Sequence, residues 1–228
     1  MLEVADGVWA VTAGTFPSNS YICRADVPGG AVLIDAGLDP LPIDAAFGRL
    51  ALTPAHLFCT HGHFDHVGSA SYFQAKYGAL VYLHGSDAKT AKTNNFLLMA
   101  MKLDARIALP DLTLVEDGAE IPLGDARARY RHAPGHTPGS CVVALGTNLF
   151  TGDTLFAHGV GLSKLAGEQP ERLRDSIAAI WDTLDAFTVH PGHGPSAPGA
   201  AVKTGNRALR AFLGFQPHDE AHRTRHDL

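Results

Sequence analysis

Four residues that could bind metal ions lie within six consecutive positions, His61-Gly62-His63-Phe64-Asp65-His66. Three imidazoles and one carboxylate in so short a segment exceed what a purely structural role requires. Imidazole nitrogens and carboxylate oxygens are common ligands of zinc and other transition metals. Because these side chains could serve two metal ions at once, we expect the rest of the chain to supply the ligands that complete the site.

Three further candidate ligands lie in loops rich in glycine and proline. His136 lies in P-G-H-T-P-G, Asp153 in T-G-D-T-L-F and His193 in P-G-H-G-P. Taken singly, each could be a turn residue or a hydrogen-bonding loop residue. However, each follows a predicted strand, as His61 does, and loops at strand ends commonly carry functional groups. Their joint occurrence therefore predicts one metal centre.

The complete set exceeds the four ligands of a closed structural zinc site, and no cysteine takes part. It comprises His61, His63, Asp65, His66, His136, Asp153 and His193. Five imidazoles and two carboxylates favour zinc, or alternatively iron or manganese, over calcium or magnesium. We therefore predict an open site for two divalent ions, which would polarise a carbonyl or phosphoryl oxygen and stabilise the oxyanion that forms.

The elements that must position these loops alternate between strands and helices. Short apolar runs predict strands at Val8–Ala13, Tyr21–Arg24, Ala31–Asp35, His56–Thr60, Leu80–Leu83, Arg127–His132, Cys141–Leu145, Asn148–Thr151 and Phe187–His190. Apolar spacing and helix boundary signals predict helices at Ile43–Leu50, Ser69–Lys76, Glu171–Leu184 and Ala200–Phe212, with one or two more between Ser86 and Leu109. Strands interrupted by helices in both halves indicate two packed sheets with helices outside.

The composition is that of a globular protein, with 228 residues, 46% hydrophobic and 18% charged. A net charge of −5 disfavours a general nucleic-acid binder. No apolar run is long enough to predict a membrane span, and the first residues do not resemble a secretion signal. Cys23, Cys59 and Cys141 lie in apolar stretches and are expected to be buried, reduced thiols. We therefore expect a cytoplasmic protein with a small-molecule substrate.

The same segments, in the same order, resemble the metallo-β-lactamase superfamily. They are L-I-D-A-G, T-H-G-H-F-D-H, P-G-H-T-P-G-S, F-T-G-D-T-L-F and P-G-H-G-P, and the resemblance runs from about Val8 to about Arg210. It implies an α/β fold, a four-layer αβ/βα sandwich of two mixed sheets with helices outside and the metals at one edge. It also implies one hydrolase domain over residues 1–215, followed by a polar C-terminal tail over residues 216–228.

The resemblance also implies a role for each ligand. One ion would be bound by His61, His63 and His136, and the other by Asp65, His66 and His193. Asp153 would bridge the two ions, so Asp65 and Asp153 are the carboxylates that we expect at the catalytic centre. Asp35, in L-I-D-A-G, matches a position that supports the metal loops.

Within the superfamily, T-P-G-S and T-G-D-T-L-F are most similar to glyoxalase II and its shorter relatives, which hydrolyse thioesters such as S-lactoylglutathione. In that mechanism a metal-bridging hydroxide attacks the thioester carbonyl, one ion stabilises the oxyanion, and the thiolate leaves. True β-lactamases lack the aspartate at position 153, so we do not expect antibiotic hydrolysis.

Two departures concern glutathione. Only 35 residues follow His193, whereas full-length glyoxalase II has a helical C-terminal domain that helps to bind glutathione. The family also uses a lysine and a tyrosine after the aspartate motif, where this chain has Leu162 and Lys164. Lys164 could still meet an anionic substrate or be a surface lysine, and His158 could line the cleft or be an ordinary loop histidine.

The apolar residues between Ser86 and Leu109 have two interpretations. They could cover the site with an apolar wall or form the core side of a helix, and they are Phe96, Leu97, Leu98, Met99 and Met101. For the whole chain, alternative functions are a lactonase or phosphodiesterase of the same fold, a persulfide dioxygenase with one iron, a non-catalytic sensor, and a nucleic-acid-processing enzyme. The intact P-G-H-G-P loop favours hydrolysis over persulfide oxidation.

Overall fold

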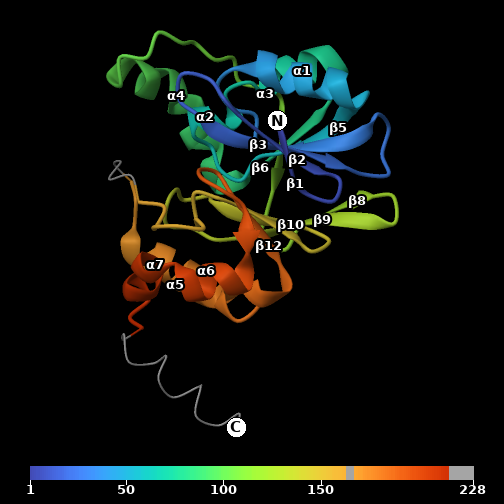
Figure 1. Cartoon of the computed structure of the whole chain (residues 1–228). Coiled ribbons are helices and arrows are strands. Elements are labelled where there is room, and N and C mark those ends of the chain that lie inside the picture. The colour runs from blue at the N-terminus through green and yellow to red at the C-terminus, as the bar shows by residue number, and fades with distance from the viewer. Residues whose placement is uncertain (163–166, 216–228) are drawn as a thin grey trace.

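The computed structural model describes residues 1–162 and 167–215 and contains two mixed β-sheets packed face to face (Figure 1). The first sheet has seven strands in chain order: β1 (Leu2–Ala5), β2 (Val8–Ala13), β3 (Ser18–Arg24), β4 (Gly30–Ile34), β5 (Thr53–Phe58), β6 (Leu80–His84) and β7 (Leu112–Val115). Strands β1 to β4 pair antiparallel, and β4 to β7 pair parallel.

The second sheet has six strands in the order β13-β12-β11-β10-β9-β8. Their bounds are β8 (Glu120–Leu123), β9 (Ala126–His132), β10 (Cys141–Leu145), β11 (Asn148–Gly152), β12 (Thr188–Pro191) and β13 (Ala197–Pro198). Only the β11–β12 pair is parallel. The prediction of two sheets is therefore confirmed.

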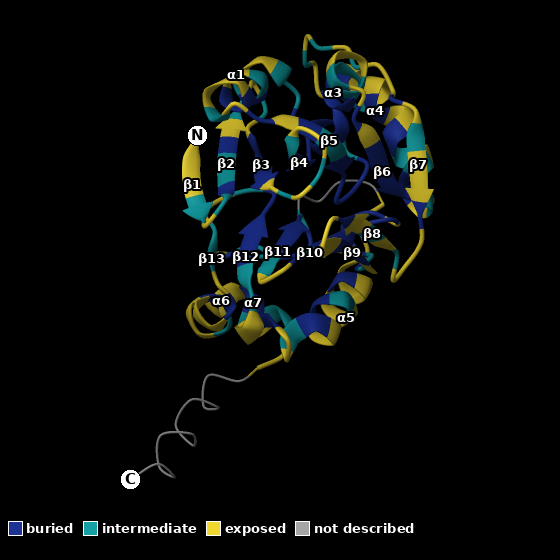
Figure 2. Ribbon diagram, turned by 90° about the vertical axis from the view of Figure 1, so that its right-hand side faces the viewer, coloured by how far each residue is buried: buried dark blue, intermediate teal, exposed yellow. Residues whose placement is uncertain are grey.

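Helices cover the outer face of each sheet, so the molecule has four layers (Figure 2). The first sheet carries α1 (Pro40–Leu50), α2 (Phe64–Val67), α3 (Ala70–Tyr77) and α4 (Ala88–Ala100), and the second carries α5 (Pro170–Trp181), α6 (Gly199–Gly205) and α7 (Arg207–Phe212). One apolar core fills the space between the sheets, and two more lie beneath the helices. The expected sandwich with helices outside is thereby confirmed.

The core residues show why these sequences form these layers. Tyr21, Ile34, Phe58 and Phe150 lie between the sheets and are fully or almost fully buried. On the outer face, Leu173 and Ile177 of α5 fall on one helical stripe and are fully buried. Burying such a side chain contributes roughly 1.5–3 kcal/mol. The apolar side chains on one face of each strand, and on one stripe of each helix, therefore determine which faces pack together.

Several predicted elements differ from those observed. Strands β1, β7, β8 and β13 were not predicted, because they have only two to four residues each and none has more than one buried position. The predicted helix Ala200–Phe212 is two helices, because Asn206 leaves helical geometry and its side chain caps α7 by accepting from the Leu209 N–H. The predicted helix Glu171–Leu184 ends at Trp181, and Leu184 begins a short 3-10 turn.

The three cysteines are buried and free, as expected. No helix within residues 1–162 and 167–215 is both long and apolar enough to cross a membrane. The predicted polar tail, residues 216–228, lies outside the described residues.

Candidate metal centre

The topology brings the candidate ligands together at one edge of the sandwich. Strands β4, β5 and β6 are parallel, so the loops that follow them meet at the same edge of the first sheet. His61 and His63 follow β5, and the short helix α2 then presents Asp65 and His66. The second sheet contributes its three ligands, His136, Asp153 and His193, from the loops after β9, β11 and β12.

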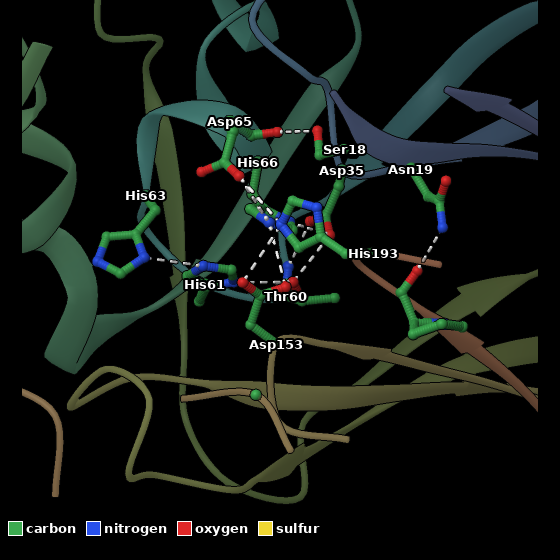
Figure 3. Close-up of polar contacts among 12 residues, drawn as sticks. Ser18, Asn19, Asp35, Thr60, His61, His63, Asp65, His66, Asp153 and His193 are labelled. Atoms are coloured by element: carbon green, nitrogen blue, oxygen red, sulfur yellow. Dashed lines mark hydrogen bonds and ion pairs between the residues drawn. The ribbon is translucent and has the colours of Figure 1, made fainter. Parts of the chain in front are cut away.

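The seven predicted ligands form three overlapping groups. The ligand atoms within each group lie within 4.8 Å of one another, and the groups are His61–His63–His136, His61–His66–Asp153 and Asp65–His66–His193. Side chains from both halves of the chain therefore surround one small volume (Figure 3). The first and third groups are the two ligand sets that the resemblance implied.

The first group consists of imidazole nitrogens that face one another. His63 Nδ1 lies 3.2 Å from His61 Nε2 and 3.0 Å from His136 Nε2. Each neutral imidazole carries a proton on only one nitrogen, so these three nitrogens cannot all be satisfied by pairing with one another. A cation between them would accept all three lone pairs.

The second and third groups combine carboxylates with imidazoles. His193 Nε2 lies 3.3 Å from Asp65 Oδ2 and 3.4 Å from Asp153 Oδ2. Asp153 Oδ1 lies 3.5 Å from His66 Nε2, and Asp153 Oδ2 lies 3.6 Å from His136 Nε2. The Asp153 carboxylate therefore faces imidazoles of the first group (His136) and of the third group (His66 and His193).

Unsatisfied polar atoms show that a metal ion fits this volume. Among the described residues, His66 Nε2 and Asp153 Oδ1 are buried without a hydrogen-bond partner. Leaving such atoms unpaired costs about 1–3 kcal/mol each. Gly192 leaves them room, because a Cβ at that position would collide with both the Asp153 carboxylate and the His66 ring. The donor set and the space thus suit a divalent ion that pairs with both atoms.

The protonation of the imidazoles divides the site into two electrostatic environments. Burial and the neighbouring imidazoles lower the pKa of His63 to about 4 and that of His61 well below its usual range. Burial also disfavours charge on His66 and His193, but Asp65 and Asp153 outweigh it, and they raise the pKa of His193 to about 9 and that of His66 well above its usual range. The carboxylate-rich half therefore attracts positive charge, which a divalent ion would supply.

Asp35 supports the ligands from behind, as the sequence predicts. Its Oδ2 lies 2.8 Å from His66 Nδ1, and it accepts hydrogen bonds from the Thr60 N–H at 2.7 Å and the Thr60 hydroxyl at 2.8 Å (Figure 3). A carboxylate on the far nitrogen orients a histidine ring and makes it a better ligand. Asp35 itself has a positive φ of 54°, a conformation that aspartate tolerates better than most residues.

Asp87 is a second supporting carboxylate that sequence analysis missed. It follows β6, is fully buried, and accepts hydrogen bonds from the Gly62 N–H at 2.7 Å, the Thr137 hydroxyl at 2.7 Å and the Gly139 N–H at 2.8 Å. Gly62 lies between two ligands, and the other two donors follow His136 in its loop. One carboxylate thus joins the loops that carry the three histidines of the first group.

Two further contacts hold individual ligands in place. His136 Nδ1 lies 3.2 Å from both Glu168 Oε1 and the Gly161 carbonyl oxygen, so its far side meets two acceptors. The loop of His193 is held by β3, where the Asn19 amide and the Tyr21 hydroxyl donate to the Pro191 carbonyl at 3.0 and 2.6 Å. A single Glu, Asn or Tyr carries no sequence signal for these roles.

A cavity of about 270 Å³ opens beside the ligands. His63, Asp65, His136, Asp153 and His193 all line it. His158 is exposed and is not one of the lining residues, so its predicted contact with substrate has no geometric support. Lys164 lies outside the described residues.

The apolar segment between Ser86 and Leu109 is neither a continuous wall nor a helix core. Leu98 of α4 is fully buried, but Phe96 and Met99 are about two-thirds exposed. Met101, at the end of α4, lines the cavity. Only one residue of the segment thus contributes to the predicted apolar wall.

Comparison with known proteins agrees with this geometry. Residues 13–193 match the family model of the metallo-β-lactamase superfamily. A hydroxyacylglutathione hydrolase of Anaeromyxobacter dehalogenans is 38% identical over 193 residues, which cover 82% of this chain and 66% of that protein.

Two solved structures extend the likeness to the fold. The crystal structure of TTHA1623 in a di-iron-bound form has a TM-score of 0.79 and 30% identity, and the match covers 87% of this chain and 98% of that one. The BLEG-1 B3 metallo-β-lactamase has a TM-score of 0.78 and 26% identity, with 89% and 99% covered. With the matched family model and the ligand cluster, these likenesses show that the chain belongs to the metallo-β-lactamase superfamily and is a metallohydrolase of that fold.

Proposed function

We propose that this protein is a binuclear metallohydrolase that cleaves a thioester or a related ester of a small molecule. The position of Asp153 carries the proposal, because its two oxygens face His66, His136 and His193 at 3.4–3.6 Å. A carboxylate between two ligand groups suits a bridge between two ions. The similarity to a hydroxyacylglutathione hydrolase supports the thioester as the substrate class.

Two divalent ions would supply a polarised substrate carbonyl and a water molecule whose pKa is low enough to attack near neutral pH. Zinc suits the imidazole-rich first group, and iron is the second candidate, because TTHA1623 was crystallised in a di-iron-bound form.

The protein's own residues then orient and enclose the reacting groups. Asp35 and Glu168 fix the ring orientations of His66 and His136 from behind. Asp153 and Asp65 place negative charge on one side of the site and so stabilise positive charge there. The same two carboxylates raise the pKa of His193. A thiolate is a good leaving group and needs little protonation. This agrees with the cavity, because every titratable residue in its described lining is a candidate metal ligand.

The function is tested by metal analysis together with hydrolysis assays on thioesters, lactones and phosphodiesters, with a β-lactam as a further substrate. Two metal equivalents per chain and thioester hydrolysis are expected. One iron per chain with oxygen consumption on a persulfide would instead identify a dioxygenase.

A further inference from the structure

The wall of the cavity beside the metal ligands is apolar. It is formed by Phe16, Phe64, Met101, Phe156 and Leu162. These residues come from the β2–β3 turn, α2, the end of α4 and the segment after β11. Four separate parts of the chain therefore converge to present carbon surface next to the reacting centre.

Aromatic contacts fix this wall relative to the ligands. The Phe16 and Phe64 rings pack edge to face with centroids 5.1 Å apart. The Phe156 ring packs edge to face against His193 at 5.9 Å, and Phe16 approaches the same imidazole at 6.4 Å. Such packing holds the rings in defined positions, so the cavity is formed before a substrate arrives.

The described side chains of the wall offer no cationic partner to an anionic substituent. Within the described part of the chain, the lining residues include no lysine or arginine, and the carboxylates are those of Asp65 and Asp153. Leu162 occupies the region where the resemblance to glyoxalase II implied a glutathione-binding lysine, and it lies in the wall. A carboxylate of the substrate would thus meet leucine and phenylalanine there, at the cost of losing its water.

The volume indicates the size of the group that the cavity could enclose. About 270 Å³ lies at the small end of ligand pockets. At roughly 30 Å³ for a water-sized atom, this space holds about nine non-hydrogen atoms. That is the size of a short aliphatic or phenylacetyl group.

We propose that the cavity binds an uncharged, apolar acyl group of about this size, next to the thioester carbonyl that reacts beside Asp153. The proposal rests on the proposed hydrolase function and names its substrate class. It predicts that hydrophobic acyl thioesters are preferred over those that carry a second carboxylate, and over S-lactoylglutathione.

The test compares hexanoyl and succinyl thioesters of N-acetylcysteamine, because the two acyl groups have the same number of non-hydrogen atoms. With the metal-loaded full chain, kcat/KM should be at least about tenfold higher for hexanoyl, since one apolar pocket discriminates by such factors. Leu162→Lys should reduce the hexanoyl-to-succinyl ratio at least about tenfold. Leu41→Lys is the matched control, because Leu41 is 65% exposed on α1 and does not line the cavity, and it should leave the ratio unchanged.

A second variant, Leu162→Ala, tests the same position in case Leu162→Lys does not fold. Leu162→Ala should lower kcat/KM for the hexanoyl thioester without raising it for the succinyl thioester. An equal or reversed preference in the wild-type chain would overturn the proposal while leaving the hydrolase function intact.

A binding measurement on the metal-free chain tests the apolar cavity separately from the hydrolase function. Calorimetry on the metal-free full chain should show that heptan-2-one binds more tightly than 4-oxopentanoate, with a negative heat-capacity change, as expected for apolar burial. Failure to hydrolyse any thioester would contradict the hydrolase function, whereas equal or tighter binding of 4-oxopentanoate would contradict the apolar cavity.

Discussion

Asp87 Oδ2 accepts a hydrogen bond from the Thr137 hydroxyl at 2.7 Å, and the same oxygen accepts from the Gly62 N–H at 2.7 Å. Thr137 adjoins His136, and Gly62 separates His61 from His63. The two halves of the chain thus meet at one buried carboxylate directly behind the three-histidine group.

Asp87→Asn should weaken metal binding at that group. The Asp87 carboxylate also accepts from the Gly139 N–H at 2.8 Å, so an amide in either orientation turns its NH₂ group toward a backbone donor. That mismatch costs about 1–3 kcal/mol, and residues that orient ligands typically affect metal affinity 10- to 100-fold. Zinc titration against a competing chelator would measure the loss.

Asp44→Asn is the matched control for that substitution. Asp44 is a partly exposed carboxylate of α1 that pairs with Lys76 of α3 at 2.6 Å. Its loss should cost at most about 1 kcal/mol of stability and leave zinc affinity unchanged. Equal zinc affinity in Asp87→Asn and Asp44→Asn would contradict the role given to Asp87.

Asp35→Asn should weaken metal binding at the Asp65–His66–His193 group. Asparagine tolerates the positive φ of 54° at this position, so the backbone should be retained. The amide oxygen can accept from the Thr60 N–H or from the His66 N–H, but not from both, because these donors face different oxygens of the carboxylate. Zinc affinity at the Asp65–His66–His193 group should therefore fall 10- to 100-fold, and the cobalt spectrum of this variant should differ from that of Asp87→Asn. Identical spectra would show that the carboxylates do not act on separate groups.

Asp153→Ala should abolish hydrolysis and lower metal occupancy. The substitution removes both oxygens that face His66, His136 and His193. The loss of activity should exceed the 10- to 100-fold range of supporting residues, and metal analysis should show fewer than two equivalents. Unchanged turnover would exclude the bridging role.

The buried His190 should make the free energy of unfolding decrease at acid pH. It is fully buried, with its nitrogens 2.8 Å from Ser196 Oγ and 2.9 Å from Asn148 Oδ1, and burial lowers its pKa to about 4. The unfolded chain, with an ordinary histidine pKa near 6.5, binds more protons between these pH values. The free energy of unfolding should therefore fall as pH drops through this window, by on the order of 2 kcal/mol between pH 7 and pH 4.5.

Urea unfolding of the metal-free chain at both pH values would measure this effect. His190→Gln should be less stable at pH 7 but should lose about 2 kcal/mol less on acidification than the wild type. His158→Gln replaces an exposed histidine and should lose as much as the wild type. Equal pH dependence in all three proteins would rule out His190 as the source.

The sequence predicted which seven side chains would cluster, because each is of an ordinary metal-ligand type and lies in a short segment with a strong local signal. It also predicted the layers, because buried strands and the stripe of α5 follow simple apolar spacing. It did not indicate the role of Asp87, because a single aspartate after a strand has the pattern of an ordinary loop residue. Only the fold places Thr137 and Gly139 against this carboxylate. The break at Asn206 was missed for a similar reason, because that side chain holds the Phe156 and Gly159 carbonyls, which lie far away in sequence.

The central claim is that Asp153 joins two metal ions in one hydrolytic site. Stepwise addition of zinc to the metal-free chain, with thioester hydrolysis measured at each step, tests it most directly. Activity should rise to a maximum at two equivalents per chain, and Asp153→Ala should show no such maximum. Full activity at one equivalent, or persulfide-dependent oxygen consumption by a chain that holds a single iron, would contradict the claim.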